Sequence, residues 1–274
     1  MFYNDGYVMR SSILSLPGTV HAFSTRLGGI STLPHTKSMN IATGHGDSED
    51  TVRRNTELLA EYLGGGFTAA DTVCAHQIHS AKVRYVGVEN RGEGTLTAPG
   101  EDCDGFVTDV RGVVPIVRTA DCTPIIMCAP RDGTTPVIAV LHAGWRGTVA
   151  DIAGQGVRKM TSLGVKAEDI RAAVGPHIGF CCFEVGEDLR DAVRSIRGED
   201  FARRHIRYVK EKGKLYADLT GMNLELLCTA GVLPSHTDMS EECTFCLENK
   251  YHSHRRGAGL RGAMGSLAAI LCNG

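Results

Sequence analysis

Two histidines and one cysteine interrupt apolar stretches of the chain, and side chains of these types bind metals or form nucleophile–base pairs. His79 lies in the segment HQIHS, Cys122 in TADCTPIIM, and His142 at the end of the apolar run VIAVL. Two imidazoles and one thiolate are good zinc ligands, and three protein ligands leave a fourth position for water or substrate. Their separations along the chain form no local metal motif. Two alternatives stay open: Cys122 as a nucleophile with either histidine as its base, and three unrelated core residues.

A second group of candidate ligands lies within the segment CTFCLENKYHSHRR. Cys243 and Cys246 have C-x-x-C spacing, and His252 and His254 follow them closely. This resembles a structural zinc set, but the H-x-H spacing is shorter than in a zinc finger. We therefore expect no second structural zinc at the two cysteines. Instead, we expect Arg255, with His254, to face the active cleft as part of an anion site; solvated surface arginines are the alternative.

Two further segments combine glycine with cysteine or with acidic residues. Adjacent side chains of an extended chain point in opposite directions, so at most one of Cys181 and Cys182 is expected to face a given site. For Cys182 we expect packing in the core. Glu101, Asp102 and Asp104 lie in a polar segment, and we expect these acidic side chains to be solvated.

The overall composition is ordinary for a soluble globular protein. The chain has 274 residues, of which 42% are hydrophobic and 22% charged, with a formal net charge of −2. This charge predicts binding neither to nucleic acid nor to an anionic membrane. No apolar run approaches the ~20 residues of a membrane-spanning helix. The segment MFYNDGYVMRSS lacks the order of a signal peptide, so we expect a cytoplasmic protein whose cysteines are thiols rather than a disulfide framework.

Predicted strands and helices alternate along the chain, and they place the polar interruptions at strand ends. A helix is expected within 46–66, where Ser48 or Asp47 caps its start and glycines stop it. Segment 112–130 predicts two strands separated by a polar break, and 135–147 predicts the strand that ends at His142. A helix with Val149, Ile152, Gly156 and Met160 on one stripe follows. Segments 170–196 and 214–232 each predict a strand and a helix, so the class is α/β or α+β.

Six motifs of this chain resemble, in type and in order, those of the YfiH-like family, also called multicopper polyphenol oxidase or laccase-domain proteins. They are HQIHS, DCDGFVTD, TADCTPIIM, LHAGWRGT, VGPHIGFCCFEVG and CTFC…YHSHRRGAGLRG, within about Ala22 to Ile270. The family's zinc ligands are the histidine of Q-x-H, the cysteine of A-D-C and the histidine of H-A-G-W. The resemblance therefore implies His79, Cys122 and His142 as zinc ligands in this chain.

The resemblance also implies a fold and an activity. The expected fold is α+β, a single domain over 1–274 with layered α/β/β/α architecture and mixed sheets, similar to the catalytic fold of cytotoxic necrotizing factor toxins. The expected activity is phosphorolysis of adenosine, inosine, guanosine and S-methyl-5'-thioadenosine, together with deamination of adenosine to inosine. The implied partners are two small molecules, a purine nucleoside and phosphate. The protein itself is expected to be a monomer or a homodimer. The alternative is peptidoglycan editing, hydrolysis of UDP-linked muropeptide precursors at a Cys–His or zinc site.

These activities need further side chains besides the metal ligands. Deamination at zinc uses a nearby carboxyl group as acid and base, and the candidates are Glu184 and Asp121. Phosphorolysis needs planar cationic groups that recognise phosphate. The candidate substrate-binding residues are Arg26, Gln77, Arg146, His254 and Arg255.

A laccase is the lesser alternative, because it requires several coppers and paired H-x-H motifs. The chain has one such pair, His252 and His254. Copper in place of zinc at the three main ligands is nevertheless expected to be possible, since copper(II) binds most such sites more tightly.

Overall fold

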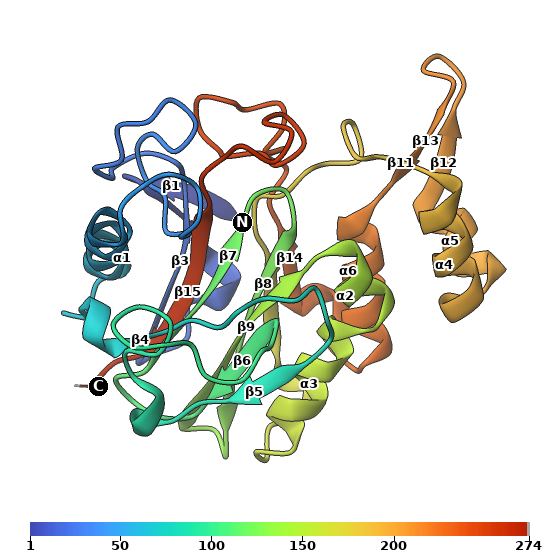
Figure 1. The fold of residues 1–274 in the computed structure, drawn as a ribbon. Helices are drawn as coiled ribbons and strands as arrows, with labels where there is room; N and C mark the ends of the chain where they lie inside the picture. Colours follow the sequence, from blue (N-terminus) through green and yellow to red (C-terminus); the bar gives the residue numbers. More distant parts are fainter. Residues whose placement is uncertain (273–274) are drawn as a thin grey trace.

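Two six-stranded mixed sheets, packed face to face, form the centre of the computed structural model, which describes residues 1–272 (Figure 1). The first sheet consists, in spatial order, of β1 (Phe2–Asp5), β2 (Val8–Ser11), β3 (Thr19–Ser24), β15 (Met264–Ile270), β7 (Val114–Thr119) and β4 (Thr72–Val73). The second consists of β14 (Thr237–Met239), β10 (Arg171–Val174), β8 (Thr123–Arg131), β9 (Thr135–Ala143), β6 (Gly105–Thr108) and β5 (Val83–Tyr85). The pairs β4–β7, β10–β14 and β5–β6 are parallel and the others antiparallel, so both sheets are mixed.

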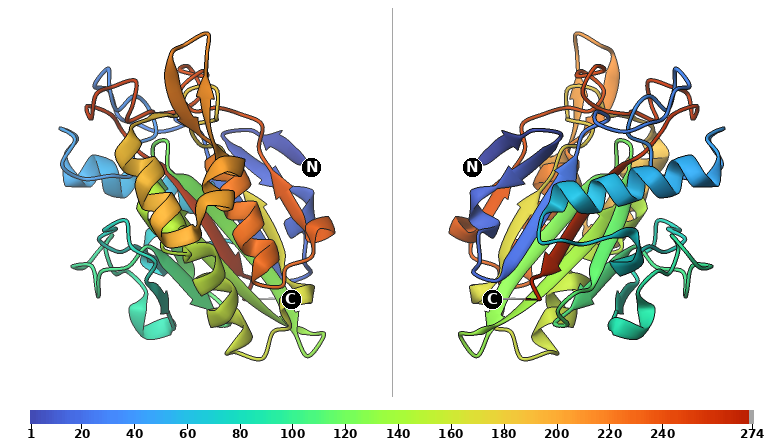
Figure 2. Two further views of the ribbon diagram at one scale, coloured as in Figure 1. Left: turned by 90° about the vertical axis from the view of Figure 1, so that its right-hand side faces the viewer. Right: turned by 90° about the vertical axis from the view of Figure 1, so that its left-hand side faces the viewer.

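Helices cover the outer face of each sheet. Helix α1 (Glu49–Leu63) packs on the first sheet, and α3 (Ile152–Thr161) and α6 (Leu219–Thr229) pack on the opposite side of the molecule, on the second sheet (Figure 2). The resulting α/β/β/α layers confirm the α+β class. That the layers make up one domain over 1–274 stays a prediction.

Strand β9 shows why the run before His142 is continuously apolar. Alternate side chains of a strand point to opposite faces. Val137, Ala139 and Leu141 pack under the helices, whereas Ile138 and Val140 pack between the sheets. A strand buried on both faces has no solvent-facing positions, which explains the absence of polar residues until its end.

Helix α1 begins and ends as its residues predict. The Ser48 side chain accepts a hydrogen bond from the Thr51 amide at the helix start, and Gly64, with φ of 85°, ends the helix. Glu49 and Asp50 occupy the first turn, where negative charge is favourable.

The helix expected after His142 is divided in two. Helix α2 (Trp145–Val149) stops, and α3 begins at Ile152 after Asp151 adopts a left-handed conformation with φ of 71°. The Asp151 carboxylate accepts a hydrogen bond from the Gly154 amide, so it caps a new helix instead of continuing the old one. The predicted stripe is still buried, because both short helices face the second sheet.

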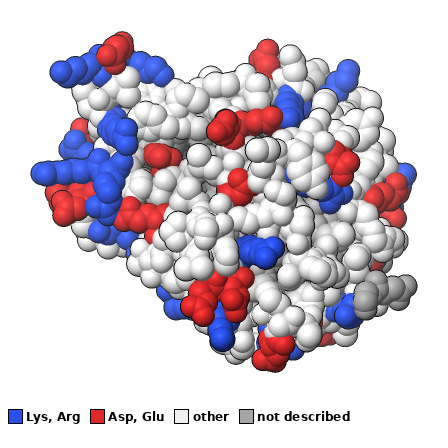
Figure 3. All heavy atoms as spheres, turned by 180° about the vertical axis from the view of Figure 1, so that it is seen from behind, with Lys and Arg blue, Asp and Glu red and all other residues white. Residues whose placement is uncertain are grey.

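A small unit extends to one side of the two sheets. It contains the three-stranded sheet β11 (Glu184–Val185), β13 (Lys214–Ala217) and β12 (Ile206–Val209), together with α4 (Glu187–Arg197) and α5 (Glu199–His205), at the right of Figure 1. Charged side chains of both signs gather on this unit, which lies at the left of the reversed view (Figure 3). Among them, Arg194 pairs with Asp191 and Arg203 with Glu199. Short 3-10 helices complete the elements, at Ser12–Leu14, Ala69–Asp71, Val88–Asn90, Ala167–Asp169 and Pro234–His236.

Within the described residues, the helices are too short or too polar to cross a membrane.

Candidate active site

His79, Cys122 and His142 converge in a pocket of about 650 Å³. Their ligand atoms all lie within 4.8 Å of one another. His79 comes from the loop between β4 and β5, Cys122 from the turn between β7 and β8, and His142 from the end of β9. The structure thus brings together three residues that the sequence separates widely.

Sheet register places these side chains. Strands β8 and β9 are antiparallel, with Pro124 opposite His142, so Cys122 lies just beyond the end of that pair. On the other side β6 pairs with β9, with Gly105 opposite Leu141, and the His142 amide donates to the Asp104 carbonyl at 2.7 Å.

Asp104 is fully buried and supports both histidines, so the expectation that it is solvated was wrong. Its Oδ1 lies 2.8 Å from Nδ1 of His142 and accepts a hydrogen bond from the His79 amide at 2.9 Å. Its Oδ2 accepts from the amide and the hydroxyl of Ser80. Burial raises the pKa of Asp104, but the hydrogen bonds from His142 and Ser80 outweigh it and hold the pKa below its usual value. An ionised Asp104 keeps the proton of His142 on Nδ1 and leaves Nε2 for a metal or for Cys122.

Cys122 and His142 favour each other's charged forms. Desolvation alone would raise the pKa of Cys122 and lower that of His142. Their mutual attraction, together with the hydrogen bonds of His79 and Asp104, reverses both effects, so the pKa of the thiol is lowered and that of the imidazole is raised. The Cys122 Sγ also lies 3.9 Å from Nε2 of His79. A thiolate beside two imidazoles is a good set of zinc donors.

Gly144 explains why small residues follow His142. A Cβ atom at this position would lie 2.7 Å from the His79 ring and 3.3 Å from the Cys122 Sγ. Glycine is therefore required for the start of α2 to approach the three candidate ligands.

Most of the expected substrate-binding residues line the same pocket: Gln77, Arg146, His254 and Arg255, with Glu184 among the carboxylates. The Arg146 guanidinium lies 4.3 Å from the centre of the Trp145 ring. Arg255 donates to the Glu184 carbonyl at 2.9 Å, which fixes the side chain at the pocket wall. The Gln77 amide is already paired with both backbone groups of Arg118, so Gln77 positions that strand as well as lining the pocket.

Arg26, the remaining residue expected to bind substrate, lies outside the lining of this pocket. Its guanidinium donates to the carbonyls of Lys37, Glu248 and Pro34. Arg26 therefore connects loops. Its residue type and the glycines beside it in the sequence do not distinguish an arginine that connects loops from one that binds a ligand.

Asp121 lines the pocket, but its carboxylate already accepts three hydrogen bonds from the protein. One oxygen accepts from the Thr244 hydroxyl at 2.6 Å, and the other accepts from the Ser253 hydroxyl and the Arg255 amide. These bonds attach the carboxy-terminal segment to the turn that carries Cys122. Glu184, which pairs with Lys214 at 2.8 Å, is the less constrained of the two candidate carboxylates.

Sequence reasoning missed four basic residues of the pocket wall: His45, His76, Arg118 and Arg261. Arg261 is half-buried, and its Nε atom is buried with no hydrogen-bond partner among residues 1–272. An unpaired buried donor is costly, so Arg261 is suited to meet a ligand oxygen. Arg261 lies in the segment GAGLRG, shortly after the candidate Arg255, and this proximity could have identified it.

The H-x-H pair does not act as a unit. His252 is buried and its Nε2 lies 2.9 Å from the Met39 carbonyl, whereas His254 is exposed at the pocket. Burial, followed by the charge of Arg26, lowers the pKa of His252 to about 3. Within the described part of the chain, side chains that could share a metal form two groups, the one above and Cys181, Cys182, Cys243 and Cys246.

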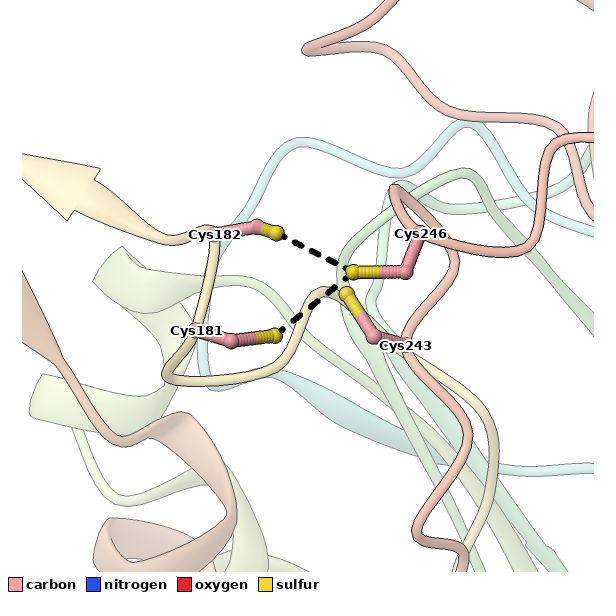
Figure 4. Close-up of side chains that lie close together, drawn as sticks. All are labelled: Cys181, Cys182, Cys243 and Cys246. Atoms are coloured by element: carbon pink, nitrogen blue, oxygen red, sulfur yellow. Dashed lines mark hydrogen bonds between the residues drawn. The ribbon is translucent and has the colours of Figure 1, made fainter.

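The expectation that Cys181 and Cys182 point apart was wrong. Residues 179–183 form a tight turn, in which the amides of Cys182 and Phe183 both donate to the Gly179 carbonyl, so the chain there is not extended. Both sulfurs approach Cys246 (Figure 4), and Cys182, which is partly buried, also packs against the hydrophobic core. The expectation of no second zinc was based on the spacing of His252 and His254, but the side chains that lie beside Cys243 and Cys246 are Cys181 and Cys182.

The chain is similar to known proteins both in sequence and in fold. Residues 20–271 match the family described as multi-copper polyphenol oxidoreductase laccase. The chain is 36% identical over 253 residues to purine nucleoside phosphorylase YlmD of Geobacillus stearothermophilus, covering 90% of this chain and 88% of the relative. It is 33% identical to adenosine deaminase RL5 of an unknown prokaryotic organism, covering 86% and 88%. Its fold is similar to the crystal structure of Bacillus licheniformis hypothetical protein YfiH, with a TM-score of 0.88, 28% identity and 98% of each chain covered.

Proposed function

The chain belongs to the multi-copper polyphenol oxidoreductase laccase family, and we propose that it is a zinc-dependent purine nucleoside enzyme. It cleaves adenosine, inosine, guanosine and S-methyl-5'-thioadenosine with phosphate, and it deaminates adenosine to inosine. The observation that carries the proposal is the convergence of His79, Cys122 and His142 in a pocket walled by arginines. Relatives named purine nucleoside phosphorylase and adenosine deaminase support it.

The donor set fits zinc. His79, Cys122 and His142 offer two nitrogens and one sulfur within 4.8 Å, and Asp104 orients His142 from behind. Three protein ligands with a supporting carboxylate are typical of catalytic zinc sites. A zinc ion bound there supplies Lewis-acid activation of a nucleophile at neutral pH. Copper can bind the same three side chains, but the separated positions of His252 and His254 do not favour a multicopper oxidase.

The surrounding residues supply recognition and proton transfer. The guanidinium groups of Arg146 and Arg255, with Arg118 and Arg261, give the pocket the positive charge that phosphate recognition needs. A pocket of about 650 Å³ is in the usual size range for a small-molecule site. Glu184, at the wall, accepts a proton from the attacking nucleophile and passes it to the purine as the ring is attacked or departs.

Product analysis tests this proposal. With adenosine and phosphate, the zinc-loaded protein should form adenine and ribose 1-phosphate, and without phosphate it should form inosine and ammonia. Cys122→Ser and His142→Ala should lose both reactions together with zinc, whereas Cys272→Ser, remote in the chain, should keep them. Intact purine nucleosides after incubation with fully zinc-loaded protein would disprove the assignment.

A second candidate, hydrolysis of an amide in a cell-wall precursor, is favoured by one observation. Asp104, His142 and Cys122 form a hydrogen-bonded series in which the thiolate is stabilised, as in a cysteine hydrolase. A chelator separates the two candidates, because it should abolish a zinc-dependent reaction and spare a Cys–His mechanism. Hydrolysis of a UDP-linked muropeptide by the metal-free protein would favour this second function.

A further inference from the structure

Four cysteine sulfurs meet outside the active-site pocket, where two loops come side by side (Figure 4). Cys181 and Cys182 lie in the turn before β11, and Cys243 and Cys246 lie in the segment after β14. None of the four lines the active-site pocket. We propose that these cysteines form a second, structural zinc site. The proposal does not depend on the nucleoside chemistry assigned to the first site.

The sulfur positions suit a tetrahedral ion. All four Sγ atoms lie within 4.8 Å of one another, with Cys246 3.3 Å from Cys182 and 3.8 Å from Cys181. Zinc–sulfur bonds of about 2.3 Å in a tetrahedron imply sulfur–sulfur distances of about 3.8 Å. Four thiolates are also the donors that select zinc over harder cations such as calcium or magnesium. Binding requires small side-chain movements and releases the thiol protons to solvent.

The backbone around Cys243 and Cys246 is arranged as a ligand-bearing turn. The Leu247 amide donates to the Cys243 carbonyl, and the Gly179 amide donates to the Cys243 Sγ at 3.2 Å. An amide directed at sulfur stabilises the thiolate that a metal requires. The facing turn at Cys181 is fixed by Lys212, whose ammonium group donates to the Cys181 carbonyl at 2.8 Å.

Contacts outside the cluster hold the two loops in position. The Arg256 guanidinium donates to the carbonyls of Thr244 and Phe245, both at 2.8 Å, and these residues separate the two cysteines of C-x-x-C. The Thr244 amide donates to the His177 carbonyl, which joins the two ligand-bearing segments. These contacts preorganise the four ligands, which reduces the conformational cost of binding a metal.

The position of the cluster gives the proposed zinc a structural task. Residues 183–186, directly after Cys182, line the active-site pocket, as do His254 and Arg255, which follow Cys246. The Thr244 hydroxyl reaches Asp121, the neighbour of Cys122. A zinc ion at the four cysteines therefore connects the two segments that form this pocket wall.

Metal counting in matched variants tests the inference. The full chain is purified without added reductant under nitrogen, and zinc per chain is measured by elemental analysis. Cys182→Ser and Cys246→Ser should each contain one zinc fewer than the native chain, whereas Cys272→Ser should match it. His142→Ala, which alters the other ligand group, should keep the zinc of the four-cysteine site. Unchanged zinc in both Cys182→Ser and Cys246→Ser overturns the proposal.

A spectroscopic measurement covers the case in which those variants do not fold. His142→Ala with its native cysteines is loaded with cobalt(II), which should give the intense thiolate-to-metal absorption and visible bands of a tetrahedral four-sulfur site. Absence of these bands overturns the proposal, as does a coloured iron protein on purification. A count of free thiols in the unfolded protein distinguishes a zinc site from a disulfide. The chain has ten cysteines, so ten free thiols agree with zinc. Eight free thiols would mean a disulfide and overturn the proposal.

Discussion

Nδ1 of His142 lies 2.8 Å from Oδ1 of Asp104, and both side chains are buried. Asp104 also accepts the amide of His79, so one carboxylate orients the strand-end histidine and the loop that carries its partner. This arrangement makes Asp104 a positioning residue for the candidate zinc ligands, although it does not itself join them.

The first prediction concerns that positioning. Asp104→Asn removes the charge that holds the proton on Nδ1 of His142, so zinc should bind about 10–100-fold more weakly. Competition with a coloured chelator measures the change. The control is Asp102→Asn, since Asp102 is exposed and contacts only His76 among the ion pairs. Native zinc affinity in Asp104→Asn would show that the carboxylate is dispensable for metal binding.

Substitution of Arg255 should weaken phosphate binding, whereas substitution of Arg26 should lower the stability of the fold. Arg255→Ala should raise KM for phosphate about tenfold or more, because a hydrogen bond to a charged group contributes about 1.5–3 kcal/mol. Its free energy of unfolding should change little, since Arg255 is exposed.

Arg26→Ala should behave in the opposite way. It removes three hydrogen bonds between loops, so it should lower the free energy of unfolding by about 1–3 kcal/mol with KM for phosphate near native. Initial-rate kinetics and urea unfolding of both variants check the pair. A larger KM effect in Arg26→Ala than in Arg255→Ala would contradict the assignment.

The proton-transfer role of Glu184 has a kinetic test. Glu184→Gln should lower kcat by about 10²–10⁴-fold while the zinc content stays native, because a positioned acid contributes to rate without holding the metal. Glu187→Gln, three residues on in the first turn of α4, is the matched control and should keep kcat. Native kcat in Glu184→Gln would remove this carboxylate from the reaction.

His21 makes stability depend on pH. Burial, assisted by the charge of Arg10, lowers the pKa of His21 from 6.5 to about 4. The unfolded chain therefore takes up the proton first as pH falls, and stability decreases between pH 6.5 and about 4. A pKa shift of one unit corresponds to about 1.36 kcal/mol, so at pH values below this range the free energy of unfolding is lower by about 3 kcal/mol.

His21→Gln keeps an acceptor for the Ser11 amide, which donates to Nε2 in the native chain, but it cannot titrate. Urea unfolding of this variant at several pH values should give a flatter pH dependence than native protein between pH 6.5 and 4. The same slope in both proteins would argue against His21 as the source.

The sequence predicted local features well where neighbours along the chain determine them. The Ser48 cap of α1 and the apolar run of β9 follow from short-range patterns. Asp104 was misjudged because its burial depends on the pairing of β6 with β9, which joins distant segments. Cys181 and Cys182 were misjudged because their turn depends on a single glycine carbonyl. Arg26 shows that the type of a residue does not tell a loop connection from a ligand contact.

The position of β15 in the first sheet has a consequence for how the protein is made. Met264–Ile270 pairs with β3 on one side and with β7 on the other. During synthesis, the residues of β3 and β7 therefore leave the ribosome long before the strand that joins them. Until then both strands have open edges, which are prone to pair with other chains. Completion of this sheet is a late, long-range event, so we expect slow folding and dependence on chaperones in the nascent chain.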